Sequence, residues 1–265
     1  MPDKPIVQLF ITCLMDTFFP DAGEAVLDVL ESQGVQVEFP PDQTCCGQPA
    51  YNAGFRQEAR ATAVRFLDVF EPAVGTAVEL PSQQEGAGEA PAAAAPIVCP
   101  SGSCTAMIKH GYLDLFKDDP DHLERARALA ARTYEFSEYL VDVMGVTGPD
   151  SSFGGTLTYH PSCHLLRGLE IDRQPRQLLA GLRGVTLIEL PEATECCGFG
   201  GLFAVKHGDV SGEILAKKLA AIRKTGAHTV VGCDMSCLMH IQGGLRRSGD
   251  AVRCLHIAEV LQGPR

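Results

Sequence analysis

Ten of the eleven cysteines form a pattern that occurs twice along the chain, and this repetition restricts the possible folds more than any other feature. In each half, a single cysteine is followed at nearly the same spacing by a Cys-Cys-Gly tripeptide and then by a further pair of cysteines. The first half contains Cys13, Cys45, Cys46, Cys99 and Cys104, and the second half contains Cys163, Cys196, Cys197, Cys233 and Cys237. The repeat predicts two copies of one structural unit, each of which brings its own cysteines together.

The two halves differ in the distance from the tripeptide to the final cysteine pair. The longer first half contains 81–96, a stretch of small, polar and charged residues without a bulky apolar side chain. Such a stretch buries too little to offset the entropy lost on ordering it, so we expect a flexible surface insertion there. When the halves are aligned on their last cysteine, Cys233 matches Pro100 and not Cys99. The first half therefore holds its metal with five cysteines or with four, or holds something else.

Apolar runs alternate with amphipathic stretches in both halves. We expect strands at 6–11, 35–39, 97–98, 157–160, 185–190 and 229–232 and helices at 21–33, 53–70, 176–182 and 211–224, with another helix that begins at Cys104. This alternation predicts βαβ units and a mostly parallel sheet in each half. The fold class is therefore α/β, with two tandem, duplicated Rossmann-like domains. We place them at 1–150 and 151–265, with a helical connector at 121–144 and a boundary rich in Gly, Pro and Ser near residue 150.

The cysteines of each half are expected to meet at one edge of its sheet. The leading cysteine and the tripeptide both follow a predicted strand, and ligands bind at the carboxyl ends of strands in open α/β sheets. Thiolates are soft ligands that favour iron-sulfur clusters, zinc and copper(I). Two adjacent cysteines can reach two different metal atoms, which favours a polynuclear cluster over one tetrahedral ion. Gly47 and Gly198 would permit a tight turn with positive φ, and the backbone N–H groups there can hydrogen-bond to cluster sulfur atoms.

The remaining candidate residues carry a weaker signal. Cys254 lies outside the repeat and is expected to be a small buried apolar residue. His160 and His164 flank Cys163, and His240 lies one helical turn beyond Cys237. A ligand or proton-relay role is open for these histidines, but a packing or capping role is the more common use of such residues.

Composition and charge exclude several classes of protein. The formal net charge of −11 has the wrong sign for a protein that binds nucleic acid. No stretch reaches the length of a membrane span, and the first residues lack the features of a signal peptide. The odd cysteine count and the adjacent pairs also fit a disulfide framework poorly. We therefore expect a cytoplasmic protein whose cysteines bind metal or carry redox chemistry.

Five segments together resemble a known family. They are CCGQP at 45–49, PSGSC at 100–104, HPSCH at 160–164, ECCGFGG at 195–201 and DMSCLMH at 234–240. This combination is similar to the cysteine-rich CCG domain, which occurs twice in one of the subunits of heterodisulfide reductase and in the iron-sulfur subunit of glycolate oxidase. The resemblance is closer to the lactate-utilisation A family of iron-sulfur-binding oxidoreductase subunits.

The resemblance implies a function. Members of this family work with companion subunits to oxidise L-lactate to pyruvate and pass the electrons onward, and those partners permit a peripheral association with the membrane. By similarity, the ten repeated cysteines would hold up to one [4Fe-4S] cluster per domain, which can be non-cubane. Some relatives bind zinc in one domain. The alternatives are a heterodisulfide or thiol reductase, a glycolate oxidase subunit, and a zinc-stabilised interaction module without redox activity.

Overall fold

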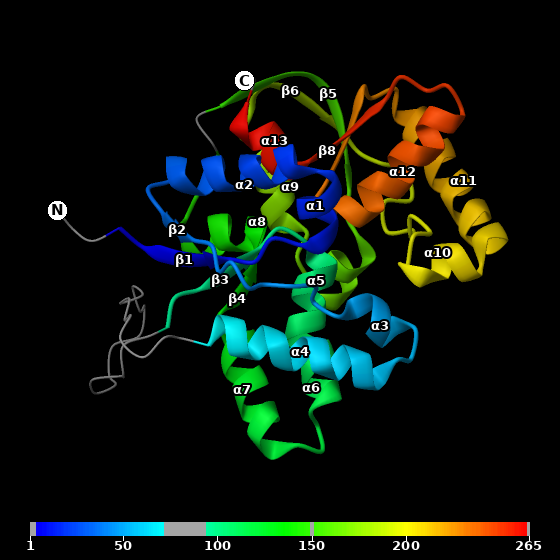
Figure 1. Cartoon of the computed structure of the whole chain (residues 1–265). Helices are drawn as coiled ribbons and strands as arrows, with labels where there is room; N and C mark the ends of the chain where they lie inside the picture. Colours follow the sequence, from blue (N-terminus) through cyan, green and yellow to red (C-terminus); the bar gives the residue numbers. More distant parts are fainter. Residues whose placement is uncertain (1–3, 72–93, 149–150, 264–265) are drawn as a thin grey trace.

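The computed structural model describes residues 4–71, 94–148 and 151–263 (Figure 1). Each half contains one four-stranded sheet in which all neighbouring strands are parallel, so the expected duplicated α/β architecture is confirmed. The sheet of the first half has the order β2-β1-β3-β4, and the sheet of the second half has the order β6-β5-β7-β8. The strands are β1 (Ile6–Leu9), β2 (Gln36–Glu38), β3 (Ile97–Cys99), β4 (Thr133–Glu135), β5 (Ser152–His160), β6 (Arg183–Ile188), β7 (Thr229–Gly232) and β8 (Arg253–His256).

Helices connect the strands and flank both sheets. In the first half these are α1 (Cys13–Phe18), α2 (Pro20–Ser32), α3 (Gln48–Asn52), α4 (Arg56–Phe70), α5 (Gly102–Ala106), α6 (Tyr112–Leu115), α7 (Pro120–Ala131) and α8 (Phe136–Glu138), with the π-helical turns η1 (Met107–Gly111) and η2 (Tyr139–Val143). In the second half they are η3 (His164–Gly168), α9 (Arg173–Ala180), α10 (Leu202–Lys206), α11 (Gly208–Thr225), α12 (Met235–Arg247) and α13 (Ile257–Gln262). In the part of the chain that the structure describes, no helix is both long and apolar enough to span a bilayer.

Two segments differ from the sequence prediction. The expected helix at 121–144 is interrupted, because 133–135 form the edge strand β4, paired with β3. Most of the expected insertion, residues 81–93, lies outside the described residues. Its last residues do not protrude: Ala95 is buried, and its carbonyl accepts a hydrogen bond from Arg132. The described chain therefore re-enters the fold one to two residues before β3.

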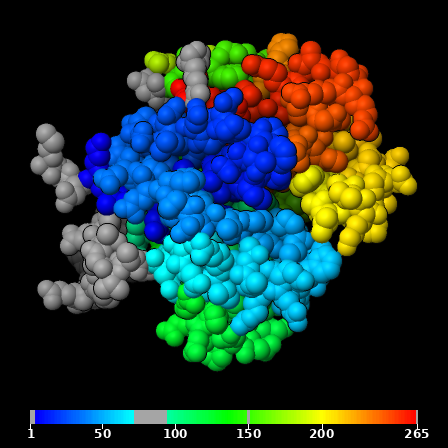
Figure 2. Space-filling model, in the orientation of Figure 1, coloured from blue at the N-terminus to red at the C-terminus, as the bar shows by residue number. Residues whose placement is uncertain are grey.

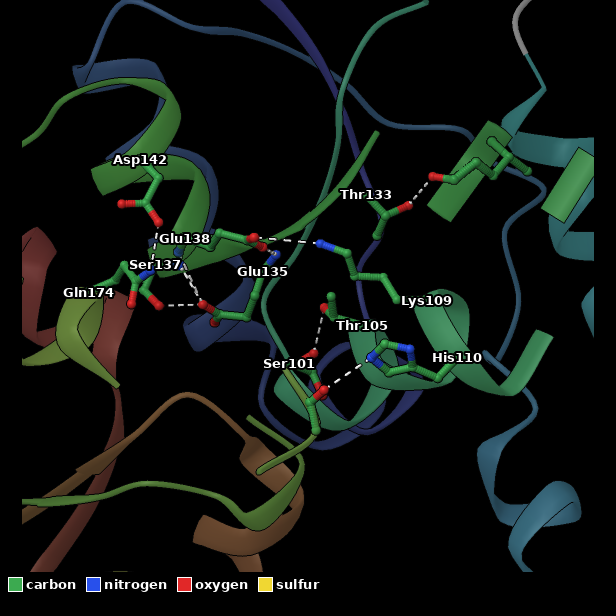
Figure 3. Close-up of polar contacts among 12 residues, drawn as sticks. Ser101, Thr105, Lys109, His110, Thr133, Glu135, Ser137, Glu138, Asp142 and Gln174 are labelled. Carbon is green, nitrogen blue, oxygen red and sulfur yellow. Dashed lines mark hydrogen bonds and ion pairs between the residues drawn. The ribbon is translucent and has the colours of Figure 1, made fainter. Parts of the chain in front are cut away.

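The two halves pack against each other reciprocally. The last helix of the chain, α13, lies beside α2 of the first half (Figure 1), and the corresponding segment of the first half, α8 with η2, packs on α9 of the second. Both contacts include a glutamine–aspartate hydrogen bond: Gln174 donates to Asp142 at 2.6 Å, and Gln262 donates to Asp28. The first pair is visible in Figure 3. The chain thus has an internal, approximately twofold arrangement that places equivalent elements of the two halves face to face.

Candidate metal centres

All five cysteines of the first half lie at the carboxyl edge of the first sheet. Cys13 begins α1, the tripeptide precedes α3, Cys99 ends β3 and Cys104 lies in α5. The Sγ atoms of Cys13 and Cys45 are 3.6 Å apart, and those of Cys46 and Cys104 are 3.3 Å apart. The thiol of Cys99 donates to the backbone carbonyl of Ser101 at 3.7 Å. The structure therefore pairs Cys13 with Cys45 and Cys46 with Cys104, and places all four beside one cavity, whereas Cys99 does not line it.

The pKa values of these thiols are shifted in opposite directions. Hydrogen bonds from Cys13 and Cys46 lower the pKa of Cys45, and hydrogen bonds from Cys46 and Cys99 lower the pKa of Cys104. The donating thiols have raised pKa values in turn: the bond to its neighbour is the main cause for Cys13 and Cys46, and burial is the main cause for Cys99. A group of thiols that stabilises thiolates in this way is ready to bind a soft cation.

Four cysteines of the second half form an equivalent group. The thiol of Cys163 contacts Cys196, Cys196 contacts Cys197, and Cys197 contacts Cys237. Hydrogen bonds from Cys163 and Cys197 lower the pKa of Cys196, as their counterparts do for Cys45. A buried imidazole joins the group: ligand atoms of His160, Cys197 and Cys237 all lie within 4.8 Å of one another. Burial, with the nearby ammonium of Lys218, lowers the pKa of His160 to about 3, so the ring is neutral.

Cys233 is the exception in the second half. It is fully buried directly after β7, and its Sγ lies 3.9 Å from the hydroxyl of Tyr159. Its thiol also interacts with Ser137, in α8 of the first half. Ser137 and the cap residue Glu135 are drawn in Figure 3. The structure therefore places Cys233 beside the contact between the halves.

Both tripeptide glycines adopt the left-handed conformation that was expected. Gly47 has φ 83° and Gly198 has φ 92°. Each backbone N–H points to the Sγ atom of the first tripeptide cysteine, at 3.4 Å from Cys45 and 3.3 Å from Cys196. A Cβ atom at Gly198 would lie 2.7 Å from the carbonyl oxygen of Ser211, so the loop also needs glycine for lack of space.

The two cysteine groups line one cavity of about 360 Å³ between the halves. Its other walls are largely apolar. They include Leu14 and Pro49 of the first half and Phe199, Leu202 and Val205 of the second. The halves also meet beside the cavity, where α10 lies next to the segment before α4 (Figure 2) and Lys206 Nζ is 5.6 Å from the ring centroid of Phe55. Val205 is 79% exposed and Cys13 is also exposed, so the cavity between the two cysteine groups opens to solvent on this side.

Asp234 connects the two groups. It is buried as the N-cap of α12, between Cys233 and Cys237, and its Oδ1 atom accepts a hydrogen bond from the backbone N–H of Ser236 at 3.1 Å. Its Oδ2 atom accepts from Ser101 Oγ at 3.1 Å and from Ser103 N at 2.9 Å. Ser101 is itself the N-cap of α5 and accepts a hydrogen bond from the backbone N–H of Cys104. The caps of the two cysteine-bearing helices therefore bind each other at the centre of the molecule, a contact that the sequence alone did not predict.

The other candidate residues lie around this centre. His164 Nδ1 is 3.7 Å from Cys163 Sγ, and His240 contacts Ser211 Oγ at 3.3 Å. Cys254 lies on β8, away from both cysteine groups, and burial raises its pKa to about 12. An inert thiol at this position agrees with the packing role expected for it.

The donor sets fit a thiolate-bound metal centre in each half. Five sulfur atoms in the first half, and four sulfurs with one imidazole in the second, exceed the four ligands of a single structural zinc ion. Soft sulfur donors favour an iron-sulfur cluster, and backbone N–H groups directed at sulfur and apolar walls are features that tune the potential of such a cluster.

Comparison with known proteins agrees with this architecture. The family model of the Cysteine-rich domain (CCG) matches residues 7–109 and 157–242. Lactate utilization protein A of Oceanobacillus iheyensis is 41% identical over 259 residues, which cover 98% of this chain and 97% of that protein. Lactate utilization protein A of an Exiguobacterium species is 43% identical over 257 residues, with 97% of both proteins covered.

A solved structure shares the fold alone. A hypothetical protein from Helicobacter pylori has a TM-score of 0.62 at 11% identity, over 98% of this chain and 49% of that one, so this chain spans about half of its length. The family assignment depends on the sequence matches. They fall on both halves and include both cysteine groups. The chain therefore belongs to the cysteine-rich CCG domain proteins and, among them, to the lactate utilization protein A family.

Proposed function

We propose that this protein is the iron-sulfur electron-transfer subunit of a system that oxidises L-lactate to pyruvate together with companion subunits. The substrate class comes from the relatives, which are named for lactate utilisation and match nearly the whole chain. The redox role comes from the geometry. Two groups of clustered thiols at one shared cavity are the observation that carries the proposal.

The residues of the chain have separate tasks in this function. The first centre would be held by Cys13, Cys45, Cys46, Cys99 and Cys104. Cys163, Cys196, Cys197 and Cys237 belong to the second. An iron-sulfur cluster supplies one-electron transfer when it is bound, and its potential depends on hydrogen bonds to sulfur, net charge and exposure to solvent. The N–H groups of the tripeptide glycines provide such hydrogen bonds, and the largely apolar walls of the cavity lower the polarity around the sulfur atoms.

Metal analysis of anaerobically purified protein tests the redox part of this proposal. We expect iron and acid-labile sulfide in similar amounts and little zinc. Cys197→Ser should lose a large share of both, because its thiol lies within the second group. Cys254→Ser is the matched control and should keep them, because that thiol lies on β8 outside both groups. Near-zero iron and sulfide in the wild type would overturn the proposal and leave the zinc-stabilised module as the better explanation.

Growth measurements test the substrate. A strain without this gene and without another lactate oxidase should fail to grow on L-lactate and should recover when the gene is returned. The same strain should grow normally on pyruvate, because the defect precedes that product. Unimpaired growth on L-lactate would exclude the proposed pathway role and favour a heterodisulfide or thiol reductase.

A further inference from the structure

The two metal centres differ at one position of the repeat. His160 lies three residues before Cys163, and Phe10 lies three residues before Cys13. Phe10 directly follows the inner strand β1, His160 is the last residue of the inner strand β5, and both are buried. Phe10 packs on Phe66 in the first half with ring centroids 4.9 Å apart. The second half therefore has an imidazole at the place where the first half has an apolar ring.

The imidazole of His160 is available for ligation. It is 1% exposed, and neither ring nitrogen has a hydrogen-bond partner among the described residues. Leaving polar atoms unpaired in a buried site is unfavourable unless something else binds them. A ring nitrogen of His160 lies within 4.8 Å of the Sγ atoms of both Cys197 and Cys237. The unpaired atoms are thus found beside the thiols that need a common metal.

Cys233 makes different contacts. Its sulfur atom interacts with the hydroxyl of Tyr159 and with Ser137, and among the described residues it shows no hydrogen bond to a second-half cysteine. The spacing of the last cysteine pair sets Cys233 apart from the repeat. Cys99 and Cys104 are one residue farther apart than Cys233 and Cys237, so Cys233 corresponds to Pro100, which has no side-chain donor.

We propose that His160 supplies a nitrogen ligand to the metal centre of the second half, in a set with Cys163, Cys196, Cys197 and Cys237, and that Cys233 lies outside this set. The inference rests on the proposed function, because it assigns ligands to one of its two clusters. Replacing a thiolate by a neutral imidazole makes the ligand set less negative. The buried ammonium of Lys218, which donates to the carbonyl oxygens of Glu192 and Ala193, lies nearby. Both features stabilise an added electron, so the second centre is reduced at a higher potential than the first.

Metal content in four variants separates the ligands. His160→Gln removes the imidazole but keeps a polar side chain of similar length, and it should lose about half of the iron and sulfide, because one of two centres is affected. Cys99→Ser should lose a similar share from the first half. Cys233→Ser and His164→Gln are the controls and should keep wild-type iron. Loss of iron in Cys233→Ser together with normal iron in His160→Gln would overturn the inference.

A spectroscopic experiment needs no change at His160. Protein labelled with ¹⁵N-histidine is purified anaerobically, poised in its paramagnetic state and studied by pulsed EPR. We expect a nitrogen coupling of the size found for metal-bound imidazole, which persists in labelled His164→Gln and His240→Gln. Iron and sulfide without such a coupling would overturn this inference but not the proposed function. Absence of iron and sulfide from the wild type would overturn both.

Discussion

Gly198 is the residue on which the second cysteine loop most directly depends. Its φ of 92° and the 2.7 Å approach to the carbonyl of Ser211 both exclude a side chain. We expect Gly198→Ala to lower the free energy of unfolding by more than about 2 kcal/mol and to reduce iron content. Denaturant unfolding and metal analysis measure the two effects.

A matched glycine in the helix that follows serves as the control for this change. Gly212 lies within α11, and a Cβ there would meet nothing within 4 Å. Gly212→Ala should be neutral or stabilise the protein by up to about 1 kcal/mol, because alanine loses less backbone entropy in a helix. If both variants were equally stable, the loop would tolerate a Cβ and the strained turn would not be needed.

Glu135 makes stability depend on pH. Burial raises its pKa from 4.5 to about 7. Between these pH values the folded chain binds more protons than the unfolded chain, so the free energy of unfolding falls as the pH rises. The full difference between the two pKa values corresponds to about 3 kcal/mol of unfolding free energy. Glu135→Gln can still accept the hydrogen bonds from the N–H groups of Ser137 and Glu138, and it carries no charge.

Urea unfolding of the wild type and Glu135→Gln at two pH values tests this effect. The two proteins should be similar near pH 5 and should differ near pH 8, where the variant is more stable. Lys109 forms an ion pair with the neighbouring Glu138 at 3.5 Å and is unchanged in both proteins (Figure 3). A difference of equal size at both pH values would mean that the carboxyl of Glu135 does not titrate in this range.

The residue types of the site were predictable, but not every side-chain direction. The repeat indicated which cysteines belong together because spacing along the chain determines which sheet edge each one reaches. It could not show that the thiol of Cys233 turns to Tyr159 in place of the cysteine group, because that depends on packing between the halves. The sequence already showed that His160 stands where the first half has Phe10. This difference alone did not predict a metal ligand, because a lone histidine at the end of a strand more often packs in the core or caps a helix.

At the scale of elements, the strongly patterned segments were predictable and the short edge strands were not. The expected helix 211–224 is observed as α11, and the expected strand 229–232 is β7. Strand β4 has only three residues and follows α7 almost directly. The helical sequence pattern continues through it, so the sequence did not predict a strand there. It forms because its backbone pairs with β3, and Glu135 then caps α8. His256 ends β8 and caps α13 in the same way.

The reciprocal helix packing makes the last helix of the chain important for the first half. Val260 on α13 is fully buried in the core that also contains Ala25 and Val29 of α2. We expect Val260→Ala to cost about 2 kcal/mol of unfolding free energy and to speed amide exchange in α2. Val210→Ala is the control on α11, where the side chain is 55% exposed, and it should change stability by less than about 0.5 kcal/mol. Unchanged exchange in α2 would show that α13 does not stabilise it.

At the scale of the whole molecule, the two halves share one buried carboxylate. Asp234 accepts hydrogen bonds from the first half through Ser101 and Ser103 and from its own helix through Ser236. A buried charge of this kind stabilises a structure only if every lone pair has a donor. Because the residues it joins lie next to Cys104 and Cys237, the same contact fixes the two cysteine groups relative to each other.

Asp234→Asn tests whether this contact couples the halves. The amide keeps the size of the carboxylate but directs an NH₂ group at two existing donors, Ser101 Oγ and Ser103 N. We therefore expect the free energy of unfolding to fall by about 2–4 kcal/mol. Amide exchange should accelerate in both α5 and α12. Asp119→Asn is the control, because Asp119 caps α7 within one half and asparagine is an equally good cap. Loss of the ion pairs with Arg60 and His122 should cost no more than about 1 kcal/mol, with no effect on α12. If amide exchange accelerated only in α12, Asp234 would act only as a local cap. The two cysteine groups would then be held in place by the apolar packing around them.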